Sequence, residues 1–267
     1  MITIVVQGGL GNQLFQYAYG RALVEMGKEV EFDISFFENN TKYTKRHFSL
    51  DMFTLSKHIA TTKKQHKQNL FTRILNKIDC DRKVRYVPVP KNADNYLADG
   101  YYNTERYFKH IREKVLNEVV LLEEGEEYKK WKEKIKGAKK SLIIHARRTD
   151  FVGSGFVNLD KEYYEKALKE FNEDCDIFLF SDDIEWLQGV VERSATSVSG
   201  NGLKDYEEFM LMSLGENFII ANSTFSWWGA WLSKAPNKKV IAPKKWFVSK
   251  FWSRANSDVV PEDWIRI

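Results

Sequence analysis

MITIVVQGGLGNQ, residues 1–13 of a 267-residue chain, already predicts an α/β fold. Residues 2–6 form a continuous apolar run rich in β-branched side chains, which is typical of a central strand buried on both faces. A glycine-rich loop at residues 8–11 ends this run, helical periodicity follows over residues 14–22, and residues 29–34 alternate as a second strand does. Strand, loop, helix and strand in this order form the opening of a βαβ unit.

The same alternation of strand and helix starts again after Gly137. Its strands are predicted from short apolar runs, at residues 141–145, 177–180, 218–221 and 240–242. We therefore expect two Rossmann-like domains that face a central cleft, because such parallel sheets bind ligands beyond the carboxyl ends of their strands. The charged segment 123–140 divides them, and we assign the domains to residues 1–130 and 131–267, with the last residues packing back on the first domain.

Composition excludes several classes of protein. The 43% of hydrophobic residues is enough to fill real cores, and a net charge of +4 is too small for a typical nucleic-acid-binding protein. No leader sequence and no apolar stretch of about 18–20 residues is visible, so we expect no transmembrane segment. Two distant cysteines make no disulfide scaffold, which favours a reducing compartment and a cytoplasmic location. The aromatic content of 14% fits either heavy cores or flat surfaces that stack on rings.

The loop at residues 8–13 has two interpretations. It resembles a dinucleotide-binding fingerprint, but Leu14 stands where that fingerprint needs its third glycine. It is either a tight turn between strand and helix, or a loop that lets backbone N–H groups and the Asn12 amide approach a ligand closely. The candidate ligand contacts in this loop are Gly9, Gly11, Asn12 and Gln13.

The cluster His145-Ala146-Arg147-Arg148-Thr149-Asp150 directly follows a predicted buried strand. Two adjacent arginines are costly to bury there unless an anion or a carboxylate meets them. Strand alternation places Arg147 on the side of His145 and Arg148 on the opposite side, so that one arginine faces a ligand while the other pairs within the protein. Because the guanidinium fork matches phosphate oxygens, the cluster indicates either a phosphate site or a structural set of ion pairs.

Two further polar groups follow predicted strands at the same sheet edge. Hydroxyl residues open an aromatic helix in the stretch Asn222-Ser223-Thr224-Phe225, where they serve either as plain helix caps or as a cradle for a diphosphate. Ser181, Asp182 and Asp183 follow the strand at 177–180, and we expect one carboxylate to cap the next helix and the other to bind a ligand. No spacing of acidic, histidine or cysteine residues predicts a metal site, since both Asp-Cys-Asp triplets precede their strands.

Five motifs together resemble the α-1,2-fucosyltransferases of glycosyltransferase family 11. They are GGLGNQLFQYAYGRAL (8–23), DGYYNTERYF (99–108), HARRTD (145–150), FSDDIEW (180–186) and IIANSTFSWWGAWL (219–232). The resemblance implies a GT-B architecture in which the C-terminal domain binds most of GDP-L-fucose and the N-terminal domain lies on the acceptor side. It also implies inverting transfer of L-fucose to the 2-hydroxyl of a terminal galactose, with no metal and no cofactor beyond the donor.

The resemblance also implies roles for residues of this chain. Arg147 would contact the β-phosphate of the donor, Gly11 and Asn12 would lie near the pyrophosphate and sugar, and the turn at 223–225 would hold phosphates. The candidate catalytic residues are Arg147, His145, Asp150 and Asn12. The candidate donor-binding residues are Gly9, Gly11, Asn12, Gln13, Arg147, Arg148, Ser181, Asp182, Asp183, Asn222, Ser223, Thr224 and Phe225. His145 and Asp150 are available as a general base, yet either serves equally well to orient the two arginines, so the base stays open.

Other functions remain as alternatives: transfer of a different GDP-sugar or to a different position, a non-catalytic glycan-binding protein, and a Rossmann oxidoreductase. The resemblance favours a bacterial enzyme that acts on an O-antigen or another surface-polysaccharide precursor, at the inner face of the membrane if that galactose-containing acceptor is lipid-linked. The tract at residues 244–252 is then a candidate for peripheral membrane contact. Tyr101, Tyr102, Tyr107 and Phe108 are candidates for stacking on sugar rings.

Overall fold

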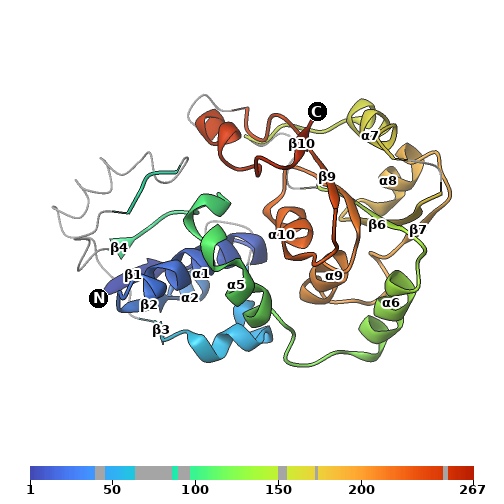
Figure 1. The fold of residues 1–267 in the computed structure, drawn as a ribbon. Coiled ribbons are helices and arrows are strands. Elements are labelled where there is room, and N and C mark those ends of the chain that lie inside the picture. The colour runs from blue at the N-terminus through green and yellow to red at the C-terminus, as the bar shows by residue number, and fades with distance from the viewer. Residues whose placement is uncertain (40–45, 64–85, 90–96, 150–154, 172–173, 249–251) are drawn as a thin grey trace. The chain divides into compact units, whose positions relative to one another are not determined.

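The structure, a computed structural model, describes residues 1–39, 46–63, 86–89, 97–149, 155–171, 174–248 and 252–267 (Figure 1). The chain divides into two compact units. Unit 1 comprises Met1–Leu122 together with Ser257–Val259, and unit 2 comprises Glu123–Asn256 together with Val260–Ile267. The assignment of donor and acceptor roles to two halves of the chain stays a prediction.

Unit 1 is built on a four-stranded sheet with the order β3-β2-β1-β4, in which every pairing is parallel. Its strands are β1 (Ile2–Val5), β2 (Val30–Asp33), β3 (Thr61–Thr62) and β4 (Leu97–Ala98). Its α-helices are α1 (Leu10–Glu25), α2 (Phe36–Asn39) and α5 (Arg112–Glu118). The described residues of this unit also form 3₁₀ turns at Leu50–Met52, Thr54–His58, Glu105–Tyr107 and Lys109–Ile111.

Helix α1 packs closely on the sheet because it carries a glycine at the contact. A Cβ atom at Gly20 would lie 2.6 Å from the ring of Phe32 in β2 and 3.4 Å from the Ile4 side chain in β1. The central position of β1 agrees with its uninterrupted apolar sequence, since Ile2 and Ile4 are buried. The carboxyl end of β1 therefore leads straight into the glycine loop and α1, as the sequence predicts.

Unit 2 contains a six-stranded sheet with the order β10-β9-β8-β5-β6-β7, again with parallel pairings. The strands are β5 (Ser141–Ala146), β6 (Asp176–Ser181), β7 (Ala195–Ser197), β8 (Asn217–Ile219), β9 (Lys239–Ala242) and β10 (Ile265–Arg266). The helices are α6 (Glu126–Lys136), α7 (Lys161–Leu168), α8 (Ile184–Val190), α9 (Asp205–Met212) and α10 (Thr224–Leu232), and a 3₁₀ turn spans Trp252–Ser257.

The strand order of unit 2 reverses between β5 and β8. From β5 the chain adds β6 and β7 on one side, and it then returns to add β8, β9 and β10 on the other. In doubly wound sheets the crevice beyond the carboxyl ends of the strands at such a switch point is where ligands bind. The α/β class is confirmed. The residues that follow β5 and β8 lie at this switch point.

Most of the aromatic excess lies in the cores. Trp227 and Trp228 are fully buried, and Trp227 contacts Trp231 and Trp264 at ring-centroid distances of 6.0 and 5.5 Å. The expectation that Tyr102, Tyr107 and Phe108 stack on sugars is wrong, because their exposed fractions are 2%, 6% and 0%. Tyr101 is half-buried.

In the part of the chain that the structure describes, no helix is long and apolar enough to cross a bilayer. In the tract proposed for membrane contact, Trp246 is buried whereas Val248 is 67% exposed and Lys244 and Lys245 are exposed. Residues 249–251 lie outside the described part, and peripheral membrane contact stays a prediction.

Candidate functional site

The polar residues after β5 and the start of α10 lie at one edge of the unit 2 sheet. Strands β5 and β8 are direct parallel neighbours, with Ile144 paired to Ile219, so the segments that follow the two strands begin at the same edge of the sheet. The two segments are also in contact, because the ring centroids of His145 and of Phe225, in the first turn of α10, are 5.9 Å apart. Residues 78 positions apart, His145 and Ser223, thereby belong to one site at the switch point.

A single carboxylate organises the loop after β5. Asp182, just beyond β6, accepts hydrogen bonds from the backbone N–H groups of Arg148 (2.9 Å) and Thr149 (3.1 Å) and from the Thr149 hydroxyl. Its Oδ2 also lies 3.3 Å from Nε of Arg147. Because that contact uses Nε, Asp182 fixes the direction of the Arg147 side chain, which remains 28% exposed. Asp182 is thus engaged within the protein and positions Arg147.

Arg148 has different partners. Its Nε donates to Oδ2 of Asp183 at 3.1 Å, and its guanidinium lies over the ring of Trp186, 3.8 Å from the centroid. Asp183 is also the N-cap of α8, where its Oδ1 accepts the Trp186 N–H at 3.3 Å. Arg148, Asp183 and Trp186 therefore bind one another within the protein. This geometry favours a structural role for Arg148 and Asp183 over the expected contacts with a donor.

His145 is buried and neutral. Its exposed fraction is 4%, and burial, reinforced by the charge of Arg147, lowers its pKa from 6.5 to about 3. Its Nδ1 has no hydrogen-bond partner among the described residues. An imidazole with so low a pKa takes up a proton poorly, which disfavours the base role considered for His145. Asp150, the other candidate base, lies outside the described residues.

The start of α10 combines structural and accessible groups. Asn222 is buried and its Nδ2 donates to the carbonyl oxygens of Val157 (2.8 Å) and Trp246 (3.0 Å), which ties two neighbouring loops to the site. Ser223 is the N-cap, and its Oγ accepts the Phe225 N–H at 3.3 Å. Thr224 and Phe225 are half-buried, so they remain reachable where the helix N-terminus favours an anion.

Ser181 is also structural, and it belongs to a short chain of hydrogen bonds that the sequence did not indicate. Its N–H donates to Oγ of Ser199 at 3.1 Å, and that hydroxyl donates to Glu208 of α9 at 2.6 Å. Burial raises the pKa of Glu208 above its usual value. No motif or spacing singles out Glu208. Thr149 and Trp186 lie within the motifs at 145–150 and 180–186, but their partners, Asp182 and Arg148, follow only from tertiary contacts.

The glycine loop belongs to unit 1. Gly8 has a φ of +84°, which favours glycine, and a Cβ there would lie 2.8 Å from Nδ2 of Asn12. Gly9 is the N-cap of α1 with open space around it, and Gly11 is buried in the first turn. Asn12 lies beside Gly8 and is half-buried, and the contact of its amide with a ligand stays a prediction.

Gln13 is buried, and its amide is occupied by the protein. Its Nε2 donates to the carbonyl oxygens of Gly8 (3.0 Å) and His47 (2.8 Å), while its Oε1 accepts the Ser49 N–H at 2.9 Å. This clamp holds the glycine loop to residues 47–49. The contact with a donor expected of Gln13 is therefore replaced by a structural role.

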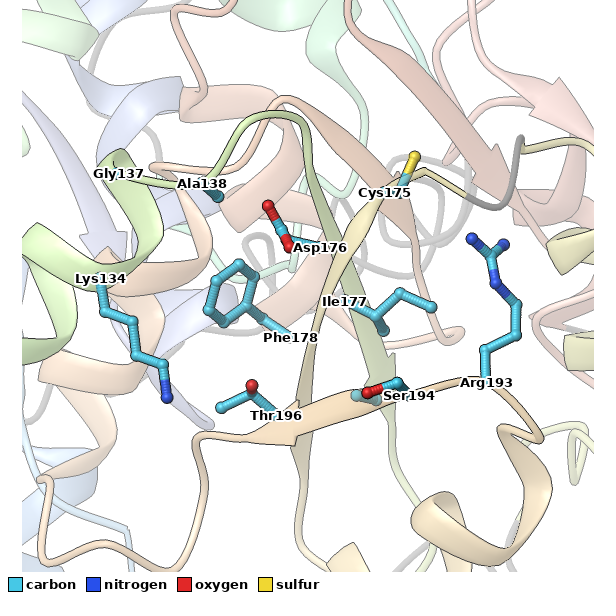
Figure 2. Close-up of a pocket in the computed structure, with 11 residues that line it drawn as sticks. Lys134, Gly137, Ala138, Cys175, Asp176, Ile177, Phe178, Arg193, Ser194 and Thr196 are labelled. Atoms are coloured by element: carbon cyan, nitrogen blue, oxygen red, sulfur yellow. The ribbon is translucent and has the colours of Figure 1, made fainter.

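A separate pocket of about 620 Å³ lies at the opposite end of the unit 2 sheet (Figure 2). It is lined by residues near the amino ends of β6 and β7, and Figure 2 shows Lys134 and Arg193 on either side of Ile177 and Phe178. Cys175, in one of the Asp-Cys-Asp triplets, lines this pocket and is a buried free thiol. Among the described residues, no group of three or more His, Cys, Asp or Glu side chains is arranged to hold a metal ion.

These observations define an α/β protein of GT-B type whose candidate site, which contains Arg147, lies at the switch point of its second sheet. The solved structure of NodZ, an α-1,6-fucosyltransferase co-crystallised with GDP, shares this fold with a TM-score of 0.54. The two chains are 14% identical, and the match covers 90% of this chain and 94% of NodZ. The model of glycosyl transferase family 11 matches residues 1–267, and the chain belongs to this family. It is a glycosyltransferase.

Relatives in Escherichia coli align along the whole chain. An alpha-1,2-colitosyltransferase is 31% identical over 292 aligned residues, covering 100% of this chain and 99% of the relative. The O-antigen biosynthesis glycosyltransferase WbnK is 29% identical and covers 98% and 99%. The mouse galactoside 2-alpha-L-fucosyltransferase Sec1 is 28% identical over 87% of this chain and 64% of its own length.

Proposed function

We propose that this glycosyltransferase transfers L-fucose from GDP-β-L-fucose to the 2-hydroxyl of a terminal galactose in a glycan acceptor, with inversion at the anomeric carbon and without a metal ion. Membership of family 11 and the 1,2 linkage in the names of its relatives support this proposal. Transfer of colitose is the second candidate, favoured by the relative that is 31% identical. An O-antigen precursor is the setting that the WbnK relative favours.

The observation that carries the proposal is the position of Arg147. Asp182 directs this partly exposed cation to the carboxyl edge of β5, and the contact between His145 and Phe225 brings the N-terminus of α10 to the same edge. When the bond between the anomeric carbon and the β-phosphate oxygen breaks, negative charge develops on the departing GDP. A fixed guanidinium and helix N–H groups stabilise that charge in the transition state.

Inversion requires a single displacement. The acceptor 2-oxygen forms its bond to the anomeric carbon on the face opposite the diphosphate, and the hydroxyl proton leaves to a base or to water. Because His145 is buried with a pKa of about 3, it is a poor acceptor of this proton. In our proposal the reaction passes through an oxocarbenium-like transition state, which needs little help from a base.

Transfer to a panel of galactosides tests the proposal directly. The full chain is incubated with GDP-fucose and lactose or other terminal galactosides, and the linkage of the product is read by NMR. We expect an α-1,2-fucosyl product. A product with another linkage, or transfer only from GDP-colitose, overturns the proposed donor or position. Calorimetric titration with GDP covers the non-catalytic alternative, since a glycan-binding protein without donor chemistry binds no GDP.

A further inference from the structure

Side-chain hydrogen bonds fix a loop at the carboxyl edge of the unit 1 sheet. Residues 99–104 follow β4, which pairs with β1, so this loop emerges beside the glycine loop. Gln7 donates from Nε2 to Asp99 at 3.0 Å, and Gln16 of α1 both donates to the carbonyl oxygen of Gly100 (3.1 Å) and accepts the Gln7 N–H (3.0 Å). The start of the 99–104 loop is thereby fixed to β1 and α1.

Tyr102 holds the middle of the loop in a strained backbone conformation. Its φ is +53°, in the left-handed region that a bulky side chain rarely adopts. The strain is maintained by packing, because the buried Tyr102 ring stacks on Tyr19 with a centroid distance of 3.9 Å and an interplanar angle of 5°. The Thr104 N–H also donates to the Tyr102 carbonyl at 2.7 Å. The residues on both sides of position 103 are therefore fixed.

Asn103 carries an unsatisfied group at this point. Its Oδ1 is buried, yet it has no hydrogen-bond partner in the described part of the chain, although the residue itself is only half-buried. A buried carbonyl oxygen without a donor is unfavourable in the folded protein. The strained backbone and the hydrogen bonds around Asn103 nevertheless keep this oxygen in place, and strain of this kind is common at ligand-binding sites.

The chemistry of this oxygen restricts what it can bind. An amide carbonyl accepts hydrogen bonds, so it cannot bind phosphate oxygens but does accept a sugar hydroxyl. The cations of the following segment are occupied, since Arg106 pairs with Asp258 (3.5 Å) and Lys109 with Glu105 (2.9 Å). We propose that Asn103 is a specificity-determining residue that accepts a hydrogen bond from a hydroxyl of the acceptor galactoside. This inference rests on the proposed function.

Initial-rate kinetics of the full chain test the assignment, with lactose varied at saturating GDP-fucose and the donor varied at saturating lactose. We expect Asn103→Ala to raise the KM for lactose about tenfold, because one hydrogen bond is lost, while the KM for GDP-fucose stays within twofold. Asn117→Ala is the matched control, since Asn117 is an exposed asparagine of α5 in the same unit. Its kinetic constants should equal those of the wild type.

Deoxygenated acceptors keep the test independent of folding. The wild type should lose about tenfold in kcat/KM toward one lactose analogue that lacks a single galactose hydroxyl other than the 2-hydroxyl. Asn103→Ala, or Asn103→Ser if alanine fails to fold, should not discriminate against that analogue. An unchanged KM for lactose, a raised KM for GDP-fucose alone, or retained discrimination overturns the inference. Absence of fucosyl transfer by the wild type, in contrast, overturns the proposed function itself.

Discussion

Arg147 and Arg148 are neighbours in the sequence but have different partners in the structure, so their alanine variants are expected to fail in different ways. Arg147 contacts Asp182 through Nε and stays 28% exposed at the switch point, whereas Arg148 is bound to Asp183 and covers Trp186. Arg147→Ala should lower turnover by about two to three orders of magnitude in a protein that still folds. Arg148→Ala should weaken the fold and leave most of the chemistry intact.

The expected magnitudes follow from these contacts. Loss of one preorganised charged donor at a departing oxyanion raises the barrier by about 3–4 kcal/mol, or about 10²–10³-fold in kcat. The fold should change little in Arg147→Ala, because Asp182 keeps the N–H groups of Arg148 and Thr149 as donors. For Arg148, the partly exposed ion pair contributes less than about 1 kcal/mol and the contact with Trp186 about 0.5–1 kcal/mol. Its removal should lower Tm by roughly 3–6 °C.

The assay measures GDP release at saturating GDP-fucose and lactose, and a circular-dichroism melt of each variant measures stability. Arg147→Lys is a useful third variant, since it keeps the charge but lacks the planar fork, and we expect it to recover only part of the lost rate. If Arg147→Ala retains more than about a tenth of the wild-type kcat, the assigned role is refuted. An inactive Arg148→Ala protein with an unchanged Tm refutes the assignment of a structural role to Arg148 and a catalytic role to Arg147.

Three further outcomes are expected. Because burial lowers the pKa of His145 to about 3, the unfolded chain takes up a proton there below about pH 6.5, and the free energy of unfolding should fall by about 2 kcal/mol between pH 7 and pH 5. Urea unfolding of His145→Gln should lack this component, and an identical pH dependence would contradict it. Gly215→Ala should destabilise the protein by about 1–3 kcal/mol, because its Cβ would lie 2.2 Å from Cγ1 of Ile143, whereas Gly189→Ala, with open space around it in α8, should be neutral or stabilising by up to about 1 kcal/mol; equal melting temperatures would refute this reasoning. Transfer should survive dialysis against EDTA within twofold, and a strict requirement for Mg²⁺ or Mn²⁺ would overturn the metal-free mechanism.

Periodicity predicts the long buried elements of this fold well. An apolar β-branched run such as residues 2–6 is typical of a strand buried on both faces. The sequences of β5, β6 and α1 have equally clear patterns. The edge strands β7 and β10 have three and two residues, which is too short for alternation to show. Their existence depends on pairing with β6 and β9.

The location of the candidate site was also accessible from sequence. Residues that directly follow parallel strands must gather at one edge of a sheet, and the contact between His145 and Phe225 shows two of the motifs doing so. The tasks of individual side chains were not accessible in this way. Alternation along β5 separates Arg147 from Arg148 but says nothing of which carboxylate each one meets, and Gln13 looks like a ligand contact until its three hydrogen bonds are seen.

The sequence by itself determined the α/β class, the family and the segments that form the site, because periodic burial and motif order are local properties of the chain. The tertiary structure alone decided that Asp182 directs Arg147 while Asp183 braces Arg148, that His145 is neutral, and that the tyrosines at 102 and 107 are core residues. It also revealed the unsatisfied oxygen of Asn103. Hydrogen-bond partners and burial depend on groups far apart in the chain, and only the packed fold brings those groups within a few ångströms of one another.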